Sequence, residues 1–405
     1  MTILPSLETA PWLADPALKR VFAALAAAGG VSRVAGGAVR NSLLGEPIAD
    51  VDIATTLEPE AVMAAGLAAE LSVHPTGLAH GTITLVADHR PFEVTTLRVD
   101  VKSDGRRASV AFTHDWVADA QRRDFTINAL YCDAEGQVFD PIGGYPDLKR
   151  RRVRFAGDAE ARITEDFLRI LRFFRFHARY GRGAPDPVGL AACVRLKHGL
   201  AGLSAERVRQ ETLKLLVAPR AVSTLKVMLE VGILPLVLPK CETLALLRQM
   251  AAIDLAQGFA PDPLLRLAAL SPDPLQLRHI LRLTNRDIAR LHALARQQPP
   301  TPALRDHERR VVLYQLGVEL WSDAVRMAWL YARARPADLH WRALHDLALT
   351  WQPPVLPVDG RDLIRQGVPA GPAIGAALRQ LEDWWLASDF KPGRDELLAR
   401  LPKET

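Results

Sequence analysis

The stretch VAGGAVRNSLLGEPIADVDIATT, which runs from Val34 to Thr56, decides the fold of the N-terminal part of this chain. The residues before Gly36-Gly37 predict a short strand that ends in glycines, and AVRNSLLG predicts a helix closed by Gly45. The residues ADVDIATT then predict a second strand. This order of strand, glycine turn, helix and strand indicates a mixed α/β unit.

Two carboxylates stand one residue apart in the second predicted strand, at Asp50 and Asp52. Side chains at positions i and i+2 of a strand point to the same face, so these carboxylates would repel each other unless a cation lay between them. Carboxylate oxygens suit Mg²⁺, which usually binds one or two carboxylates together with substrate phosphates. Taken alone, the pattern also fits an exposed strand with an acidic outer face.

The glycine pair ahead of the helix favours the metal hypothesis over the acidic face. A strand that ends in Gly36-Gly37 and opens into a helix lets backbone N–H groups approach a phosphate, and the helix dipole favours the anion. Arg40, one turn into the helix, could add a guanidinium to a phosphate oxygen. By itself a glycine pair is only a tight turn. Together with the carboxylates it predicts a nucleoside triphosphate site and two-metal phosphoryl transfer.

The composition is that of an ordinary globular protein. With 405 residues, the chain is long enough for two or three domains, and 49% of its residues are hydrophobic. The three cysteines, Cys132, Cys193 and Cys241, are far apart and in no metal-ligand spacing. This pattern argues against a disulfide scaffold or a zinc site and favours a reducing compartment. The sequence shows no apolar run of membrane-spanning length and no signal-peptide pattern. We therefore expect a cytoplasmic protein without a membrane partner.

Positive charge gathers in one window of the sequence. Residues 149–182 hold eleven Lys or Arg against four Asp or Glu, a surplus larger than the net charge of +5 for the whole chain. Such a window indicates a polyanionic partner such as a nucleic acid, although charge runs are usually solvated helix faces.

The segment AGGAVRNSLLGEPIADVDIAT resembles the first motif of the class II tRNA nucleotidyltransferases and bacterial poly(A) polymerases, which belong to the DNA polymerase β superfamily. The resemblance implies that Asp50 and Asp52 are the catalytic metal ligands for Mg²⁺. It also implies a nucleotide-binding role for Gly36, Gly37 and Arg40. The chain departs from the family at Asn41, where an aspartate usually follows the arginine. Asparagine keeps a hydrogen-bonding side chain and loses a charge, and we expect the chemistry to survive.

Further segments extend the resemblance. QRRDFTINAL, residues 121–130, resembles the second motif of the family and implies that Arg123, Asp124 and Asn128 bind the ribose and triphosphate of the nucleotide. Residues 98–116 resemble the flexible loop of the family. FEVTTLR offers Glu93 as a third catalytic carboxylate on a neighbouring strand, with an ion pair to Arg98 or an exposed turn as the alternatives.

EDFLRILRFFRF, residues 165–176, resembles the motif that selects the nucleotide in the family. We expect it to form one helix on which Asp166 and Arg169 share a face. A carboxylate accepts from the amine of cytosine or adenine, and an arginine donates to the adjacent ring nitrogen. The resemblance implies that these two residues, with Arg172 nearby, read CTP and ATP in place of a template. The alternative is a surface helix with internal salt bridges.

The fold prediction is α+β: a small polymerase β-like nucleotidyltransferase domain with a mixed sheet and helices, followed by an elongated all-α region. The expected boundaries are 1–145 for the catalytic head, 146–220 for a helical neck that recognises the base, 221–350 for a helical body and 351–405 for a helical, RNA-binding tail. Residues 358–378 resemble the tail motif of the family.

The predicted activity is template-independent addition of CMP and AMP, from CTP and ATP, to the 3′ acceptor end of tRNA. Poly(A) polymerase, A-adding and CC-adding activities share nearly every motif and remain alternatives. A non-catalytic RNA-binding relative would be expected to lose the metal ligands, which are present here. A phosphohydrolase is disfavoured, because the His-Asp dipeptides at His114 and His345 lack a matching set of further ligands. The expected RNA contacts are Lys149, Arg150, Arg151 and Arg152, and the sequence leaves the oligomeric state open.

Overall fold

The computed structural model describes residues 4–103, 108–271, 273–296 and 299–401. The chain forms two compact units. Unit 1 comprises Met1–Glu242 with Ile280–Arg282, and unit 2 comprises Thr243–His279 with Leu283–Thr405. Residues 104–107, in the segment that resembles the flexible loop of the family, lie outside the described residues.

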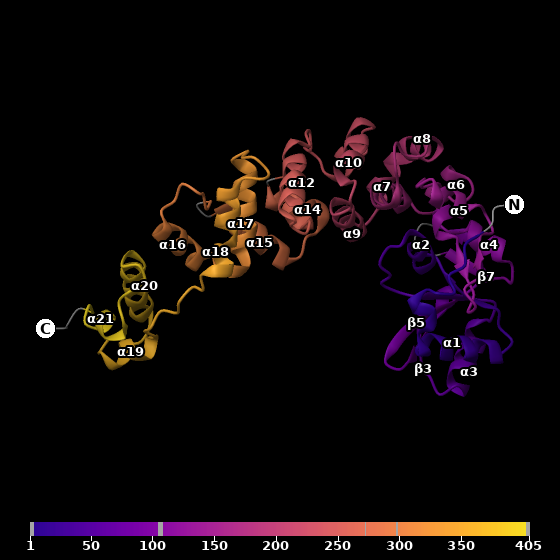
Figure 1. The fold of residues 1–405 in the computed structure, drawn as a ribbon, viewed down its shortest axis with the longest axis horizontal. Coiled ribbons are helices and arrows are strands. Elements are labelled where there is room, and N and C mark those ends of the chain that lie inside the picture. Colours follow the sequence, from indigo (N-terminus) through magenta and orange to yellow (C-terminus); the bar gives the residue numbers. More distant parts are fainter. Residues whose placement is uncertain (1–3, 104–107, 272, 297–298, 402–405) are drawn as a thin grey trace. The chain divides into compact units, whose positions relative to one another are not determined.

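A seven-stranded mixed sheet forms the centre of unit 1, in the order β3-β4-β5-β2-β1-β8-β9 (Figure 1). Strand β2 runs parallel to β5, and the other neighbours in this sheet are antiparallel. A separate two-stranded sheet joins β6 to β7. The strands are β1 (Ser32–Ala35), β2 (Asp52–Thr55), β3 (Ser72–Gly77), β4 (Thr82–Ala87), β5 (Arg90–Thr96), β6 (Arg98–Ser103), β7 (Ala108–Phe112), β8 (Tyr131–Cys132) and β9 (Val138–Phe139).

The two faces of the sheet have different coverings. Helices α1 (Pro16–Ala27) and α3 (Pro59–Ala68) contact the strands and each other, and both present buried apolar residues. Paired residues in neighbouring strands share a face, and the alternation puts Val34 and Ile53 on one face and Ala35 and Ala54 on the other. Ala35 and Ala54 pack in a cluster with Tyr131. Asp52, two residues before Ala54, therefore lies on the face opposite Ile53.

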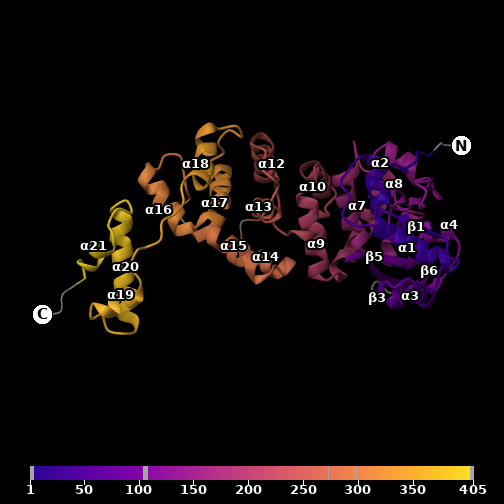
Figure 2. The same cartoon turned by 60° about the horizontal axis from the view of Figure 1, so that its bottom comes forward.

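Helices continue the chain beyond the sheet, as Figures 1 and 2 show. The helices of unit 1 are α1, α2 (Gly37–Leu44), α3, α4 (Trp116–Gln121), α5 (Gly144–Lys149), α6 (Ala159–Glu165), α7 (Leu168–Tyr180), α8 (Pro187–Leu196), α9 (Ala205–Leu216), α10 (Ala221–Glu230) and α11 (Leu234–Val237). Helix α7 is the buried centre of this group, because it packs against α9 and α10 and buries Phe173 and Phe174 completely.

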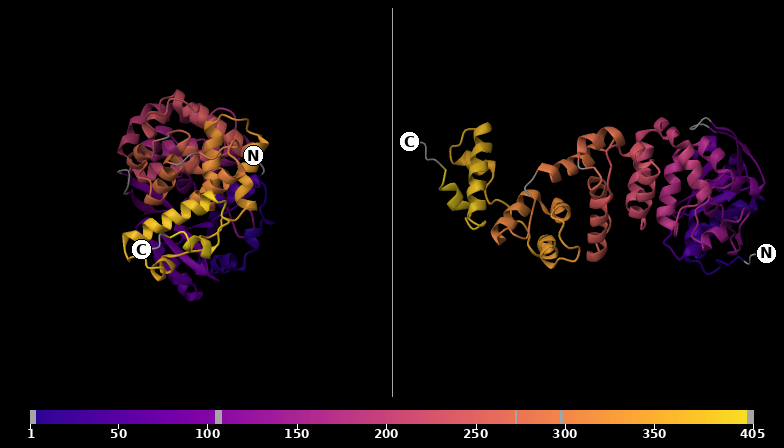
Figure 3. Two further views of the ribbon diagram at one scale, coloured as in Figure 1. Left: turned by 90° about the vertical axis from the view of Figure 1, so that its left-hand side faces the viewer. Right: turned by 90° about the horizontal axis from the view of Figure 1, so that it is seen from above.

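Unit 2 is helical throughout the residues described. Its helices are α12 (Ala245–Gln257), α13 (Pro263–Ala268), α14 (Pro274–Leu281), α15 (Asn285–Arg296), α16 (Asp306–Leu316), α17 (Val318–Tyr331), α18 (Leu339–Thr350), α19 (Gly360–Arg365), α20 (Pro372–Ala387) and α21 (Arg394–Leu398). Trp321 and Trp329 are buried between α17 and α18, which lie side by side in Figure 1. The C-terminal helices, yellow in Figure 3, form a second small core around Trp385.

The structure confirms the α+β prediction, with a mixed sheet first and helices after it. Two local predictions were wrong. Strand β2 begins at Asp52, so Asp50 lies in the connection before the strand. Residues 165–176 do not form one helix, because α6 ends at Glu165 and Asp166 is extended, with φ −156° and ψ 104°. No helix in the described parts of the chain is long and apolar enough to cross a membrane.

Candidate active site

The glycine turn lies between β1 and α2, and its first residue, Gly36, is strained by any side chain. Gly36 has φ +70°, a conformation that L residues rarely adopt, and it precedes the first turn of α2. A Cβ on Gly36 would come within 3.3 Å of the Arg123 guanidinium. The first N–H groups of a helix have no partner within the helix, so this turn offers donors beside an arginine. The geometry suits a phosphate.

The carboxylates of Asp52, at the start of β2, and Glu93, in the middle of β5, lie side by side on neighbouring strands. The β1 register pairs Asp52 with Ala35, directly before the glycine turn. The parallel register of β2 and β5 pairs Ile53 with Val94, so Asp52 and Glu93 are adjacent and point to the same face. Asp52 and Glu93 therefore lie on paired strands, whereas Asp50 lies in the loop before β2.

The charges around Asp52 favour a cation. Partial burial raises the pKa of its carboxyl above the usual value, the charges of Glu93 and Asp50 raise it further, and Arg123 acts in the opposite direction. Within the described residues, no group of three or more His, Cys, Asp or Glu side chains could hold a metal ion. Two close carboxylates that repel each other still fit Mg²⁺, provided that phosphate oxygens complete its coordination.

A chain of hydrogen bonds crosses the floor of the site. Arg40, which is only 6% exposed, donates to the Asn128 side-chain oxygen, and the Asn128 amide donates to Asp124 at 2.8 Å. Arg172 donates to the other oxygen of Asp124, at 2.9 Å from its Nε. Burial opposes the ionisation of Asp124, but Arg172 and Asn128 outweigh it and its pKa falls below the usual value. Arg40 also donates to the Tyr180 hydroxyl at 2.7 Å, so its guanidinium is largely committed to protein partners.

Arg123 is held by an aspartate that the sequence did not single out. Its Nη2 donates to Asp119 at 3.1 Å, and the Tyr131 hydroxyl donates to the same carboxylate at 2.7 Å. Asp119 is 1% exposed and also pairs with Arg122 at 2.7 Å. Burial acts to raise the pKa of Asp119, yet the two arginines hold it below the usual value. The i,i+3 and i,i+4 spacing of an acid and two arginines was the signal that could have found it.

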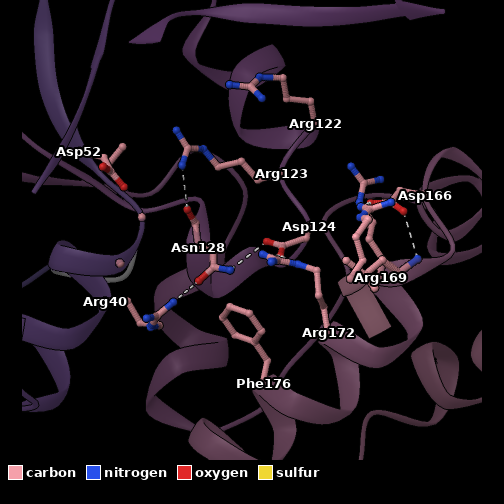
Figure 4. A pocket seen from close by; sticks show the side chains of 15 residues that line it. Arg40, Asp52, Arg122, Arg123, Asp124, Asn128, Asp166, Arg169, Arg172 and Phe176 are labelled. Carbon is pink, nitrogen blue, oxygen red and sulfur yellow. Dashed lines mark hydrogen bonds and ion pairs between the residues drawn. The ribbon is translucent and has the colours of Figure 1, made fainter. Parts of the chain in front are cut away.

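These residues surround a pocket of about 500 Å³, within the usual range for small-molecule sites. Six arginines and three aspartates line it, so its charge suits a polyanionic ligand. Figure 4 shows Asp52 on one side of the pocket and Asp166 with Arg169 on the other, with Asn128 and Asp124 between them. The lining residues are Ala35, Gly36, Gly37, Arg40, Asp52, Arg122, Arg123, Asp124, Asn128, Asp166, Leu168, Arg169, Arg172, Phe176 and Arg207.

Asp166 and Arg169 both line the pocket, but each has another ionic partner. Asp166 accepts from Arg207 of α9 at 2.6 Å and from the Leu168 backbone N–H at 3.1 Å. Arg169 pairs with Glu165 and donates to the backbone oxygen of Arg162 at 2.7 Å. These partners in neighbouring segments hold the Asp166 and Arg169 side chains in place. A salt bridge between Asp166 and Arg169 alone would not fix them to the rest of the site.

The predicted RNA contacts differ in their surroundings. Lys149 and Arg150 are exposed. Arg152 is ion-paired with the buried carboxylate of Asp186, and Arg151 lies 3.7 Å from Glu46. Of the four residues, Lys149 and Arg150 are therefore the ones best placed for an external partner.

Two family models match the chain. Residues 32–154 match the "Poly A polymerase head domain", and residues 185–251 match the "Probable RNA and SrmB- binding site of polymerase A". The first match contains the glycine turn, both strand carboxylates and the Arg123 segment.

Named relatives are similar over nearly the whole chain. The mitochondrial CCA tRNA nucleotidyltransferase 1 of Mus musculus is 35% identical over 92% of this chain and 86% of its own length. The CCA-adding enzyme of Geobacillus kaustophilus (strain HTA426) is 31% identical over 90% of this chain and 91% of its own. The crystal structure of the Bacillus stearothermophilus CCA-adding enzyme in complex with CTP matches with a TM-score of 0.75 and 29% identity, covering 95% of this chain and 96% of that one.

Proposed function

The chain belongs to the family of class II CCA-adding enzymes, and on this premise we propose how its pocket adds nucleotides to the 3′ end of tRNA. The observation that carries the assignment of the site is the register that sets Asp52 beside both the glycine turn and Glu93. In this proposal the Asp52 carboxylate, which would take part in the reaction, lies next to the glycine turn, which suits a phosphate.

We assign the nucleotide an orientation along the pocket. The triphosphate lies at the N–H groups of the first turn of α2, beginning with Gly37, and near Arg123, where Asp119 keeps the guanidinium fixed. The Gly36 N–H is already bonded to the Leu130 carbonyl oxygen at 2.9 Å. The ribose lies over Asp124 and Asn128. The base reaches Asp166 and Arg169, on the other side of the pocket from Asp52 (Figure 4). Arg40 and Arg172 donate hydrogen bonds to Asn128 and Asp124, respectively, and are therefore positioning residues in this proposal.

Asp50 and Asp52 would hold Mg²⁺, with Glu93 as a third carboxylate beside them. The metal would neutralise charge on the triphosphate and make the 3′ hydroxyl of the RNA a better nucleophile. The protein's own contribution is to keep the triphosphate and the attacking hydroxyl in line, because fixed geometry removes much of the entropic barrier.

The activity is tested with tRNA transcripts that end before CCA, after C and after CC. Each transcript is incubated with Mg²⁺ and one labelled nucleotide at a time. We expect CMP to be added to the first two and AMP to the third, with addition stopping at CCA. Long A tails on unrelated RNA would indicate a poly(A) polymerase. Addition of AMP to the transcript that ends after CC, without CMP addition to the other two, would indicate an A-adding enzyme. CMP addition to the first two transcripts, without AMP addition to the third, would indicate a CC-adding enzyme.

RNA binding should depend on Lys149 and Arg150. Phosphate contacts release counterions, so the affinity for tRNA should fall steeply with salt. We expect the double variant Lys149→Glu/Arg150→Glu to weaken tRNA binding and to flatten the salt dependence, with the affinity for CTP unchanged, as measured by filter binding at several salt concentrations. The matched control is Arg20→Glu, an exposed arginine of α1 that pairs with Asp88 and lies outside the segment that matches the RNA-binding model. Equal tRNA affinity in the double variant and the wild type would contradict the assignment.

The domain roles and the compartment stay predictions. We keep the head at 1–145, the neck at 146–220, the body at 221–350 and the tail at 351–405. Cys132, Cys193 and Cys241 are buried and form no disulfide within the described residues, which is compatible with a reducing compartment such as the cytoplasm. The relative from Mus musculus is, by its name, mitochondrial.

A further inference from the structure

The loop of residues 45–51 joins α2 to β2 and carries Asp50. Helix α2 ends at Leu44 and the strand begins at Asp52, so no strand pairing fixes the position of Asp50. A loop carboxylate contributes to a metal site only where the rest of the fold holds the loop in one place. The question is which residues of this chain hold it.

Asn41 connects the loop to the buried part of the pocket. Its side-chain oxygen accepts from Arg40, at 3.1 Å from Nε and 2.9 Å from Nη2. Its amide nitrogen donates to the carbonyl oxygen of Pro47 at 2.7 Å. Arg40 is fixed in turn by the Tyr180 hydroxyl and by the Tyr180 ring, 4.1 Å from its guanidinium carbon. The Asn41 amide thus links two parts of the chain: its oxygen accepts from Arg40, which is held in place, and its nitrogen donates to the loop.

The adjacent loop residue is held from another side. Glu46 accepts from Arg179 of α7 at 2.7 Å, and Arg151 lies 3.7 Å away. The loop is therefore fixed at two consecutive residues, Glu46 and Pro47, which lie four and three positions before Asp50. Both supports are solvent-exposed, but salt screens the Glu46 ion pair, whereas the hydrogen bond from Asn41 joins two uncharged groups and depends less on salt.

We propose that Asn41 is a positioning residue for the metal ligand Asp50, acting through its hydrogen bond to the Pro47 carbonyl. The proposal rests on the metal role assigned to Asp50 above. An aspartate at position 41 would keep the acceptor for Arg40 but would have no hydrogen to donate to Pro47. Two oxygens would then face each other across 2.7 Å, and the loop would have to move. The replacement of the family's usual aspartate by asparagine is thus matched to the loop in this chain.

The test compares Asn41→Asp with Asn285→Asp, an exposed asparagine at the start of α15. Mn²⁺ binding to the enzyme in the presence of CTP is followed by electron paramagnetic resonance, and single-turnover CMP addition is measured against Mg²⁺ concentration. Loss of a partner outside the metal's own ligands typically weakens metal binding about 10- to 100-fold. We expect a shift of that size in both measurements for Asn41→Asp, with the KM for tRNA unchanged, and no shift for Asn285→Asp. Wild-type metal dependence in Asn41→Asp would overturn the proposal.

Two further variants separate the possible failures. If Asn41→Asp is unfolded by circular dichroism, Asn41→Ala decides instead: it removes the donor to Pro47 without placing a second oxygen opposite that carbonyl, it should shift the metal dependence in the same direction, and an unshifted curve would overturn the proposal. Asp50→Ala tests the premise. Full activity in Asp50→Ala would remove the metal role of Asp50 and the inference with it. Loss of activity there, combined with unshifted metal binding in Asn41→Asp, would remove only the inference about Asn41.

Discussion

Replacing Asp52 by asparagine is expected to abolish CMP and AMP addition while the protein stays folded. The amide keeps the size of the side chain but removes the charge that would bind Mg²⁺ beside the glycine turn. Metal stabilisation of transition-state charge is worth several kcal/mol, so the rate should fall by roughly a thousandfold or more. Single-turnover incorporation at saturating CTP and tRNA measures the effect. Asp50→Asn should act in the same direction.

The stability of the Asp52→Asn variant separates catalysis from folding. Burial raises the pKa of Asp52, and the charges of Glu93 and Asp50 raise it further, so the ionised carboxylate costs folding free energy at neutral pH. Removing that charge should leave the free energy of unfolding in EDTA equal or higher, whereas Mg²⁺ with CTP should no longer raise the melting temperature. Asp395→Asn, an almost fully exposed carboxylate on α21, is the matched control. A variant at position 52 with normal turnover would contradict the assignment of the active site.

Local sequence was enough to predict the strand, glycine turn and helix, because each signal lies within a few residues. Gly36 has the positive φ that a strand-to-helix turn of this kind needs, and Gly45 closes α2 in the left-handed conformation. The start of β2 could not be predicted in the same way. It is set by pairing with Ala35 of β1 and with β5, which lies some forty residues further along the chain. Asp50 falls just outside that pairing.

Long-range partners also explain what the sequence missed around α7. Residues 165–176 were predicted to form a single helix, but Asp166 is extended, and its carboxylate accepts from Arg207 of α9 as well as from the Leu168 N–H. The arginines of α7 belong to the basic window of residues 149–182, which indicated a polyanionic partner. In the structure two of them meet acids from distant segments: Arg172 pairs with Asp124, and Arg175 pairs with Glu211. Acidic partners so far away in sequence leave no local signal.

Replacing Asp166 by asparagine is expected to weaken the exclusion of UTP and GTP. A carboxylate can only accept, so it favours the amine of cytosine or adenine and repels the carbonyl that uracil or guanine presents at the same edge. An amide can donate to that carbonyl. We expect the preference for CTP over UTP, as the ratio of kcat/KM values, to fall by about 1–3 kcal/mol, roughly ten- to a hundredfold. Steady-state incorporation of all four nucleotides into a transcript that ends before CCA measures the change.

The competing hypothesis makes Asp166 only the partner of Arg207, a link between the α6–α7 junction and α9. Both side chains are partly exposed, at 23% and 33%, and such a pair is worth about 0–1 kcal/mol of stability. Asp166→Asn would then lower the melting temperature slightly and leave the ranking of nucleotides unaltered. Glu160→Gln, in the first turn of α6, breaks an exposed ion pair with Arg195 of α8 and controls for loss of charge. The two hypotheses differ in the expected change of kcat/KM for UTP. Only if Asp166 reads the base does the variant use UTP better than the wild type does. A gain of activity toward the wrong nucleotide cannot come from a weakened scaffold.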